Sequence, residues 1–243
     1  MRENHFDEPV AARSDGELGH MADAAAIDPA VDVLAELAGD GPALEFAVGT
    51  GRIALPLSER GVPVRGIELS QAMVDRLRAK PGGETIDVAI GDMATTRVDA
   101  TFSLVYLVFN TIGNLTTQRD QVQCFRNAAA HLRPGGRFVI EVGIPDLRRL
   151  PPGETLRVFD RTTDHLGVDE YDVVDQGLVS HHWTRLDGRW HLSSTPFRYV
   201  WPAELDLMAQ LAGMALVERW GGWDRTPFTS ESRSHVSVWE LPD

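Results

Sequence analysis

The chain has 243 residues, 43% of them hydrophobic, and a formal net charge of −13 at neutral pH. This length accommodates one substantial domain, and the hydrophobic content is ordinary for a globular protein. The negative charge repels polyanions and disfavours nucleic acid as a partner. The first residues lack the basic start and apolar core of a secretory signal, and no apolar stretch is long enough for a membrane helix. We therefore expect a cytoplasmic protein without a membrane partner.

The single cysteine, Cys124, limits the chemistry that the chain can support. It has no partner for an internal disulfide, and a cysteine-based metal site is equally unavailable. The histidines and acidic residues show no spacing that predicts a metal centre, so no metal is expected. These observations leave the oligomeric state open.

The amino-terminal part of the chain divides into an arm and a helix. Residues 1–27 are polar and lack a regular hydrophobic period, which predicts an N-terminal arm. From Asp28 to Leu37 the apolar residues recur with helical spacing. Asp28 is expected to be the N-cap and Pro29 the first helical residue. A turn rich in glycine over residues 39–42 then ends this helix.

Short apolar runs and amphipathic stretches alternate along the middle of the chain. This alternation predicts βαβ units and a parallel sheet. The expected strands are Ala43–Val48, Val62–Leu69, Ile86–Ile90, Phe102–Val108 and Arg137–Val142. The expected helices are Arg52–Arg60, Gln71–Lys80 and Gln118–Leu132, the last of them stopped by Pro134-Gly135-Gly136.

After Pro145 the composition and pattern of the sequence change. Short segments rich in aromatic and β-branched residues are separated by turn signals. The expected antiparallel strands are Leu156–Phe159, Tyr171–Val174, Leu178–Arg185 and Trp190–Tyr199. A helix from Trp201 to about Ala212 and strands near Leu216–Arg219 and His235–Leu241 complete the chain. The sequence thus predicts one domain over residues 28–243, with residues 150–200 forming an antiparallel insertion.

The strongest local signal is a strand that runs into a glycine turn and then a helix, from Leu44 to Ala54. Gly49 and Gly51 allow a tight turn and a close approach of a ligand to the backbone. Glu68 ends the next strand, where its carboxylate can accept both hydroxyl hydrogen bonds of a ribose. Either S-adenosylmethionine or NAD satisfies these features. Because Gly49-Thr50-Gly51-Arg52-Ile53-Ala54 also fits the dinucleotide fingerprint, an NAD-dependent oxidoreductase is one alternative.

Two further motifs separate these alternatives. Gly91-Asp92-Met93 follows the third expected strand, and Leu132-Arg133-Pro134-Gly135-Gly136 precedes the fifth. Together with Glu45 to Gly51 and Glu68, this ordered series resembles the motifs of class I S-adenosylmethionine (SAM)-dependent methyltransferases of the small-molecule type, over roughly residues 28–145. The resemblance implies a Rossmann-like α/β fold whose mostly parallel, seven-stranded sheet has helices on both faces and an antiparallel last strand. It also implies SAM as cofactor and S-adenosylhomocysteine as product.

The resemblance places the cofactor along the carboxyl ends of the early strands. Glu45 and Gly49 would lie by the amino-acid portion of SAM, Glu68 on the ribose, and Asp92 with Met93 at the adenine. The full set of candidate cofactor residues is Glu45, Ala47, Gly49, Gly51, Arg52, Glu68, Leu69, Met73, Asp92, Met93 and Val108. Ala47 departs from the family pattern, which has a glycine there, and this narrows the space for the methionyl tail.

The acceptor is expected at the end of the fourth strand, under the insertion. Methyl transfer is an in-line displacement, so alignment matters more than a dedicated base. Asn110 and, as a general base, His182 are the candidate catalytic residues. Candidate acceptor-binding residues are Phe109, Asn114, Glu141, His181 and Tyr199. His181 and His182 are adjacent in one strand and should point to opposite faces of the sheet.

The sequence leaves the acceptor atom open among the amines, hydroxyls and carbons of a metabolite or natural-product intermediate. The segment after the fourth strand lacks the Asn/Asp-Pro-Pro-aromatic motif common in base-methylating family members, which again disfavours nucleic acid. A SAM-binding protein without turnover is a further alternative, because it would retain the same cofactor motifs.

Overall fold

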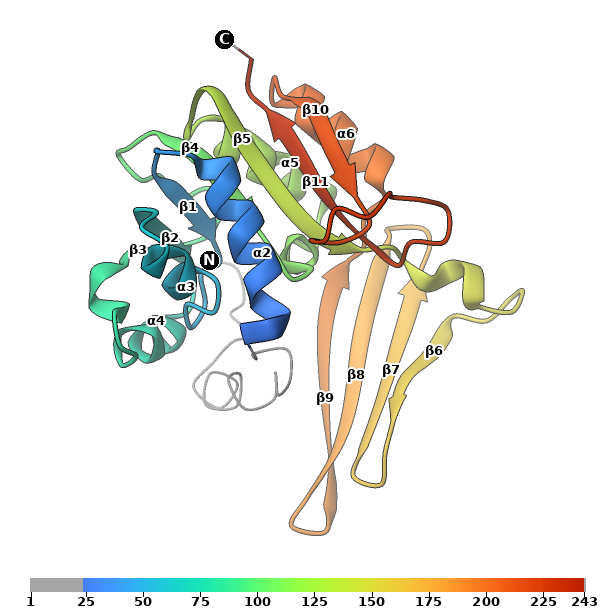
Figure 1. Ribbon diagram of the computed structural model, residues 1–243. Coiled ribbons are helices and arrows are strands. Elements are labelled where there is room, and N and C mark those ends of the chain that lie inside the picture. Colours follow the sequence, from blue (N-terminus) through green and yellow to red (C-terminus); the bar gives the residue numbers. More distant parts are fainter. Residues whose placement is uncertain (1–23, 243) are drawn as a thin grey trace.

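A computed structural model describes residues 24–242, so most of the predicted N-terminal arm lies outside the described residues. Seven strands form one sheet in the order β10-β11-β5-β4-β1-β2-β3 (Figure 1). Strands β1 to β5 are parallel, whereas β11 is antiparallel to both β5 and β10. The strands are β1 (Ala43–Phe46), β2 (Val64–Glu68), β3 (Asp87–Ile90), β4 (Phe102–Leu107), β5 (Leu132–Gly143), β10 (Ala215–Trp220) and β11 (Ser234–Glu240). The predicted mostly parallel, seven-stranded sheet is confirmed.

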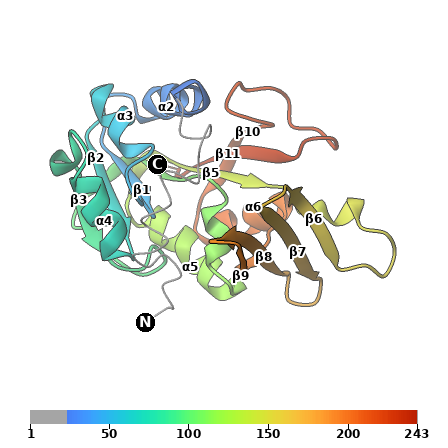
Figure 2. The ribbon, with the colours of Figure 1, turned by 90° about the horizontal axis from the view of Figure 1, so that it is seen from below.

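Helices cover both faces of this sheet, as predicted. Helices α2 and α3 lie on one face and α5 and α6 on the other (Figure 2). Each pair buries its own cluster of aliphatic and aromatic side chains against the sheet. The helices are α2 (Ala24–Ala38), α3 (Ala54–Glu59), α4 (Gln71–Arg78), α5 (Gln118–Ala129) and α6 (Pro202–Leu211). Short 3₁₀ helices occur at η2 (Gly83–Thr85), η3 (Thr111–Asn114) and η4 (Asp146–Arg149).

The predicted start of the first helix is wrong. Helix α2 begins at Ala24, and both Asp28 and Pro29 lie inside it. Alanine has the highest helix propensity, and a run of alanines extends the helix toward the amino terminus. Asp28 does not cap the helix, because its carboxylate pairs with Arg60 Nη2 at 2.8 Å.

The predicted end of the third helix is also wrong. Helix α5 ends at Ala129, and strand β5 already begins at Leu132. The backbone between them is used by the sheet: Phe102 N–H donates to the carbonyl of His131 at 2.8 Å, and Gly135 N–H donates to Leu241 at 2.8 Å. The Pro-Gly-Gly sequence therefore lies within an irregular strand and does not terminate the helix.

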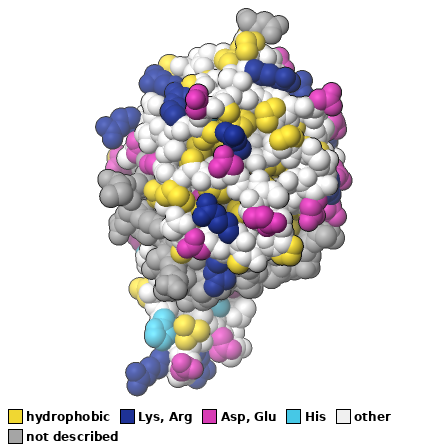
Figure 3. Space-filling model, turned by 90° about the vertical axis from the view of Figure 1, so that its left-hand side faces the viewer, with side chains coloured by type: hydrophobic (Ala, Val, Ile, Leu, Met, Phe, Trp, Pro, Cys, Tyr) yellow, Lys and Arg dark blue, Asp and Glu magenta, His cyan; other side chains and the backbone are white. Residues whose placement is uncertain are grey.

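The insertion forms a separate four-stranded antiparallel sheet in the order β6-β7-β8-β9. Its strands are β6 (Leu156–Arg161), β7 (His165–Asp172), β8 (Gly177–Leu186) and β9 (Arg189–Arg198). The prediction of a strand over Tyr171–Val174 is wrong in its second half, because Asp172 Oδ1 accepts the N–H of Val174 at 2.8 Å and turns the chain. The sheet projects beyond the main body, with charged side chains at its far end (Figures 1 and 3).

A buried network centred on Arg198 fastens the inner end of this insertion sheet to the main domain. The Arg198 guanidinium donates to Gln121 of α5, to Gln176 at 3.0 Å and to Glu204 of α6 at 2.7 Å. Gln121 in turn donates to the carbonyl of Ile112 in η3 at 3.2 Å. The end of β9, the start of α6 and the loop after β4 are thus held as one unit.

Within the part of the chain that the structure describes, no helix has both the length and the apolar character needed to cross a bilayer. The same part contains no group of three or more histidine, cysteine or acidic side chains arranged to hold a metal ion. Cys124 is a buried thiol in α5 and forms no disulfide.

Candidate active site

The turn after β1 is built from residues with left-handed backbone conformations. Ala47, Gly49 and Gly51 have φ angles of 53°, 57° and 81°. Glycine adopts this region without a Cβ clash, whereas alanine does so at a cost, so Ala47 is a strained position. A glycine is the residue that the family pattern has at this position, and the turn keeps the corresponding shape with Ala47.

Glu68 joins this turn to the end of β2. Its carboxylate accepts hydrogen bonds from the N–H groups of Gly49 and Ser70, each at 2.8 Å. Strands β1 and β2 are parallel neighbours, so their carboxyl ends bring the turn and the carboxylate together. Burial raises the pKa of Glu68 above its usual value, and the backbone donors act against that rise. The sequence could not reveal that Glu68 organises the glycine turn before any ligand binds.

Glu45 is a second buried carboxyl, located on β1. The hydroxyl of Tyr106 on β4 donates to Glu45 Oε2 at 2.9 Å. Burial raises the pKa of Glu45 to about 8, against the effects of the Tyr106 hydrogen bond and the nearby Arg52 guanidinium. Glu45 is therefore mostly protonated at neutral pH in the ligand-free protein, even with the Arg52 guanidinium nearby.

The end of β3 supplies the segment predicted to meet the adenine. Asp92 Oδ1 accepts from Ala94 N–H at 2.8 Å, which fixes the turn after Gly91. The carbonyl of buried Met93 accepts from Asn127 of α5 at 2.7 Å. On α4, the helix that follows β2, Met73 N–H donates to Ser70 Oγ at 3.4 Å. These contacts place the predicted adenine segment at the carboxyl edge, one strand beyond Glu68.

Beside these residues, a cavity of about 130 Å³ lies at the carboxyl ends of β1, β4 and β5. The Arg52 guanidinium stacks over the ring of Phe109, 3.9 Å from its centre. The Glu141 carboxylate accepts from the N–H of Phe109 at 3.0 Å. The cavity is lined by Ile27, Ala30, Arg52, Ile53, Val108, Phe109, Glu141 and Trp223. Four predicted site residues thus share one cavity: Arg52, Val108, Phe109 and Glu141.

Asn110 has a defined structural partner. Its φ angle is 61°, and its side-chain oxygen accepts from the N–H of Gly143 at the end of β5. Its own N–H donates to the carbonyl of Glu141 at 3.2 Å. Asn114 closes η3, the short helix that follows. Asn110 therefore ties the ends of β4 and β5 together next to the cavity.

The two adjacent histidines of β8 have separate partners, as the strand geometry predicts. His182 Nδ1 lies 3.0 Å from His165 Nε2, and its Nε2 lies 3.2 Å from Ser180 Oγ. His181 instead contacts Ser194 Oγ at 2.8 Å and Glu170 at 3.1 Å. The histidines thus occupy opposite faces of the insertion sheet.

One of these faces is turned toward the main domain. Phe197, whose side chain packs at Gly113 in η3, pairs directly with Leu178, which in turn pairs with Tyr171. His182 lies on the same face, because it is an even number of residues from Leu178 along β8. The ring of Tyr199 packs 5.9 Å from that of Tyr171. We call the side that holds Phe197, Tyr171 and His182 the inner face. His181 lies on the outer face.

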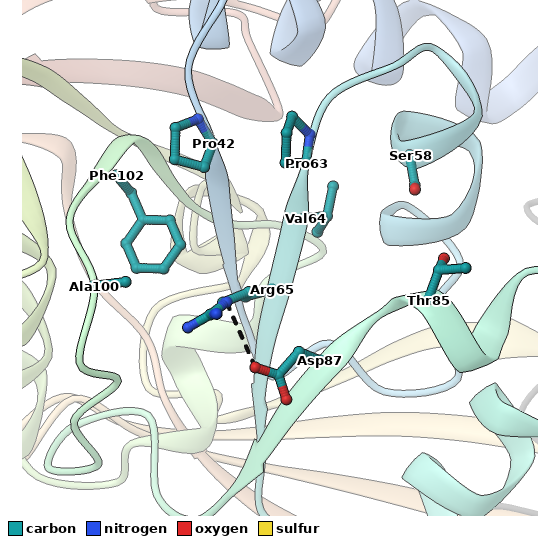
Figure 4. Close-up of a pocket in the computed structure, with 9 residues that line it drawn as sticks. All are labelled: Pro42, Ser58, Pro63, Val64, Arg65, Thr85, Asp87, Ala100 and Phe102. Atoms are coloured by element: carbon teal, nitrogen blue, oxygen red, sulfur yellow. Dashed lines mark ion pairs between the residues drawn. The ribbon is translucent and has the colours of Figure 1, made fainter.

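A larger cavity of about 480 Å³ lies at the opposite edge of the parallel sheet (Figure 4). It is lined by residues at the starts of strands, including Val64, Asp87 and Phe102. Arg65 and Asp87 form an ion pair of 3.5 Å across it. Ligands of open α/β sheets bind at the carboxyl ends of the strands. The smaller cavity near Arg52 is therefore the relevant one despite its size.

The residues at the carboxyl edge fit an adenosine-containing ligand. A Cβ built on Gly49 would meet only one atom, the carbonyl oxygen of Ala47 at 3.9 Å, so the space above this glycine is open to a ligand. A Cβ on Gly51 would press against Leu55 and Leu77 at about 3 Å, so this glycine serves packing. Two buried carboxyls, a glycine turn and the Asp92 segment define an α/β fold that binds such a ligand at its carboxyl edge.

Comparisons with known proteins identify the family. Residues 43–136 match the model of a methyltransferase domain. The CcbJ methyltransferase from Streptomyces caelestis is 37% identical, with a TM-score of 0.80 over 88% of this chain and 89% of its own. The cypemycin N-terminal methyltransferase of a Streptomyces species is 27% identical over 81% of this chain and 82% of its own. An amino-sugar enzyme of Streptomyces venezuelae, dTDP-3-amino-3,4,6-trideoxy-α-D-glucopyranose N,N-dimethyltransferase, is 32% identical over 40% of each chain.

The chain belongs to the class I SAM-dependent methyltransferases and is an enzyme of that family. The predictions of methyltransferase activity, of SAM as cofactor and of a role in small-molecule methylation are confirmed by these relationships. The alternatives of an NAD-dependent oxidoreductase and of a SAM-binding protein without turnover are set aside. The roles of individual site residues stay predictions.

Proposed function

We propose that the chain transfers methyl groups from SAM to an amine of a small-molecule acceptor. The observation that supports this most directly is the inner face of the insertion sheet, which meets η3 at the carboxyl edge through Phe197 and carries Tyr171, Asp169 and His182 outward from there. A carboxyl group that can ionise and neutral hydrogen-bond acceptors suit a cationic amine better than an anionic or purely apolar substrate. Two of the relatives are named for methylation of an amino group, on a peptide amino terminus and on an amino sugar.

In this proposal the buried carboxyls hold the cofactor. Glu68 accepts from the ribose hydroxyls with the lone pairs that Gly49 and Ser70 leave available, and the Asp92–Met93 segment meets the adenine. Glu45 faces the ammonium group of the methionyl tail and Arg52 its carboxylate, since Glu45 is buried on β1 and the half-buried Arg52 follows the glycine turn close enough to lower the pKa of Glu45. Leu69, Met73 and Val108 supply apolar contacts at the same edge. When bound, SAM supplies a methyl group already activated by a sulfonium.

The acceptor is aligned by the segment after β4. Phe109 and Glu141 wall the cavity next to Arg52, and Asn110 fixes this wall by its bond to Gly143. Asn114 and Tyr199 lie where η3 and the insertion sheet come together. Such alignment is the main requirement of an in-line displacement. Residues 150–200 act as the acceptor-covering part of a single catalytic domain.

The test is a methyl-transfer screen with matched acceptors. SAM labelled in its methyl group is incubated with the full-length chain and with dTDP-amino sugars, peptides with a free amino terminus, and short DNA and RNA. Each amine is paired with a counterpart that has a hydroxyl in its place. We expect label only in amines, detected by mass spectrometry. Methylation of the hydroxyl counterparts alone, or of nucleic acid, would contradict the proposal.

A further inference from the structure

The inner face of the insertion sheet holds a continuous chain of hydrogen-bonded titratable groups on three strands. His165 Nδ1 contacts the carboxylate of Asp160, and His165 Nε2 lies 3.0 Å from His182 Nδ1. His182 Nε2 lies 3.2 Å from Ser180 Oγ, and Ser180 is hydrogen-bonded to Asp169. The chain begins at Asp169, which lies two residues from Tyr171 on the same face of β7. It ends at the half-exposed side chain of Asp160.

When both histidine rings are neutral and Asp160 is ionised, the donors and acceptors in this chain are satisfied in one direction. A neutral His165 that donates Nδ1–H to Asp160 has an acceptor at Nε2, which receives Nδ1–H from His182. His182 Nε2 is then an acceptor and must receive the hydroxyl hydrogen of Ser180. The single hydrogen of Ser180 is thereby used, so Asp169 must donate to Ser180 and is neutral. Burial raises the pKa of Asp169, which favours this neutral form, whereas the hydrogen bond to Ser180 and the nearby charges of His182, Arg157 and His181 act against that rise.

The environment of the chain shields its middle. The ring of Phe159 occupies the space above Gly167, which has no side chain, and packs edge-on against His182 at 5.4 Å. A side chain at position 167 would displace this ring. Asp160 at the outer end is the member with ready access to solvent, with 46% of its side chain exposed. A proton that enters the chain at Asp169 can therefore leave to solvent at Asp160.

We propose that Asp169, Ser180, His182, His165 and Asp160 form a proton-transfer chain that deprotonates the amine acceptor and delivers its proton to solvent. This rests on the proposed function, because an ammonium has no lone pair with which to attack a methyl group. Shifting one proton along each bond ionises Asp169 and protonates Asp160, which then releases that proton to water. Asp169 next takes a proton from the ammonium, and the neutral nitrogen forms its bond to carbon as the carbon–sulfur bond of the sulfonium breaks.

This assignment gives His182 a different part from the direct general base that the sequence predicts. Asp169 is the catalytic residue that touches the acceptor, and Ser180, His182 and His165 act through it. The sequence could not show this, because the five residues of the chain come from three strands, and the sequence does not specify how those strands pair.

The first test needs no acceptor. Nitrogen-15 NMR of the histidine side chains in the full-length protein, at a pH of about 8 where a free histidine is neutral, reports which ring nitrogen is protonated. We expect both His165 and His182 to carry the proton on Nδ1, and Asp160→Asn to disturb both rings. A proton on Nε2 of His182 would overturn the chain whatever the substrate is.

The second test uses an amine acceptor found in the screen. Ser180→Ala and His182→Gln should lower kcat about 10- to 100-fold near neutral pH. The loss should shrink in alkali, where the free amine is already neutral, and the affinity for SAM should be unchanged. Ser180→Thr keeps the hydroxyl and should retain activity, and His191→Gln, at an exposed histidine of β9, is the matched control. A pH profile of Ser180→Ala identical to that of the wild type would overturn the proposal. A wild type that methylates no amine would instead contradict the proposed function.

Discussion

The parallel sheet and the insertion sheet differ in how deeply their residues are buried and in which groups hold them together. Every residue of β1 and β4 is buried, and the polar groups there, such as Glu45, are held by one or two specific bonds. Most residues of β9 are exposed, and the inner face of the insertion is organised by polar side chains in contact with one another. The first sheet is covered by helices on both faces, whereas the second is fastened mainly at one end.

This difference explains how one chain binds a constant cofactor and an enzyme-specific acceptor. The cofactor edge is defined by backbone geometry, namely the glycine turn and the ends of parallel strands, which packing on both faces makes rigid. The acceptor face is defined by side chains on a sheet with little packing of its own. Side chains there can change without a loss of the core, and the Arg198 network keeps the sheet in position.

The largest expected effect is a difference in the free energy of unfolding between alanine variants of two tryptophans. Trp239 on β11 is fully buried, packs 5.3 Å from Phe125 and donates to Asp206, whereas Trp190 on β9 is 52% exposed. Trp239→Ala should lower the free energy of unfolding by about 3–5 kcal/mol, because it leaves a cavity and removes one of the donors of Asp206, which keeps its ion pair with Arg219. Trp190→Ala should change it by about 0.5 kcal/mol or less. Denaturant unfolding of both variants measures this, and similar losses would contradict the contrast between the two sheets.

The junction between the sheets should show the next largest effect. Arg198→Met removes the buried cation of the network and should cost about 3 kcal/mol, because Glu204 loses its cationic partner and the side-chain oxygens of Gln121 and Gln176 lose their donor. Arg185→Gln, which breaks an exposed 4.0 Å pair with Asp164, is the control and should cost about 0.5 kcal/mol or less. Hydrogen exchange should show faster exchange in β8 and β9 of Arg198→Met. Unchanged exchange there would contradict the role of Arg198 in fastening the insertion sheet to the main domain.

At the cofactor edge, Glu68→Ala should weaken SAM binding by about 1–3 kcal/mol, because a charged acceptor of the ribose hydroxyls is lost together with the anchor of the glycine turn. Glu68→Gln keeps an acceptor oxygen and should lose less. Calorimetry against SAM and S-adenosylhomocysteine measures both variants. Equal affinity of the folded Ala variant and the wild type would place the ribose elsewhere.

The smallest effect concerns protonation of Glu45. With its pKa raised to about 8, Glu45 is protonated in the free protein at neutral pH, and a bound ammonium favours its ionised form. SAM binding should therefore release close to one proton at a pH of about 7. Its affinity should rise about tenfold, or ~1.4 kcal/mol, from a pH of about 6 to about 7. Calorimetry in buffers of different ionisation enthalpy measures the proton, and Glu45→Gln should abolish it. Release of a proton by the Gln variant as well would assign it to another group.

Much of the cofactor edge could be predicted from local sequence. A strand, a glycine turn and a carboxylate at the end of the following strand are contiguous signals, and the carboxyl ends of neighbouring parallel strands must meet. One error fell where a local signal competes with long-range pairing. Pro134-Gly135-Gly136 is a helix-stop signal by composition, but its backbone is taken up by the sheet and the chain terminus.

The sequence by itself determined the fold class and the succession of strands and helices along the chain, because hydrophobic period and glycine turns are properties of short segments. The cofactor followed from the resemblance of the motif series to a known family. It also placed His181 and His182 on opposite faces, since that follows from strand geometry alone. Only the tertiary structure decided which face looks inward, that Arg198 joins three elements, and that Asp160 and Asp169 share one hydrogen-bonded chain with His182. Those contacts depend on strand register, which is set by the packing of the whole sheet and leaves no mark in a local segment.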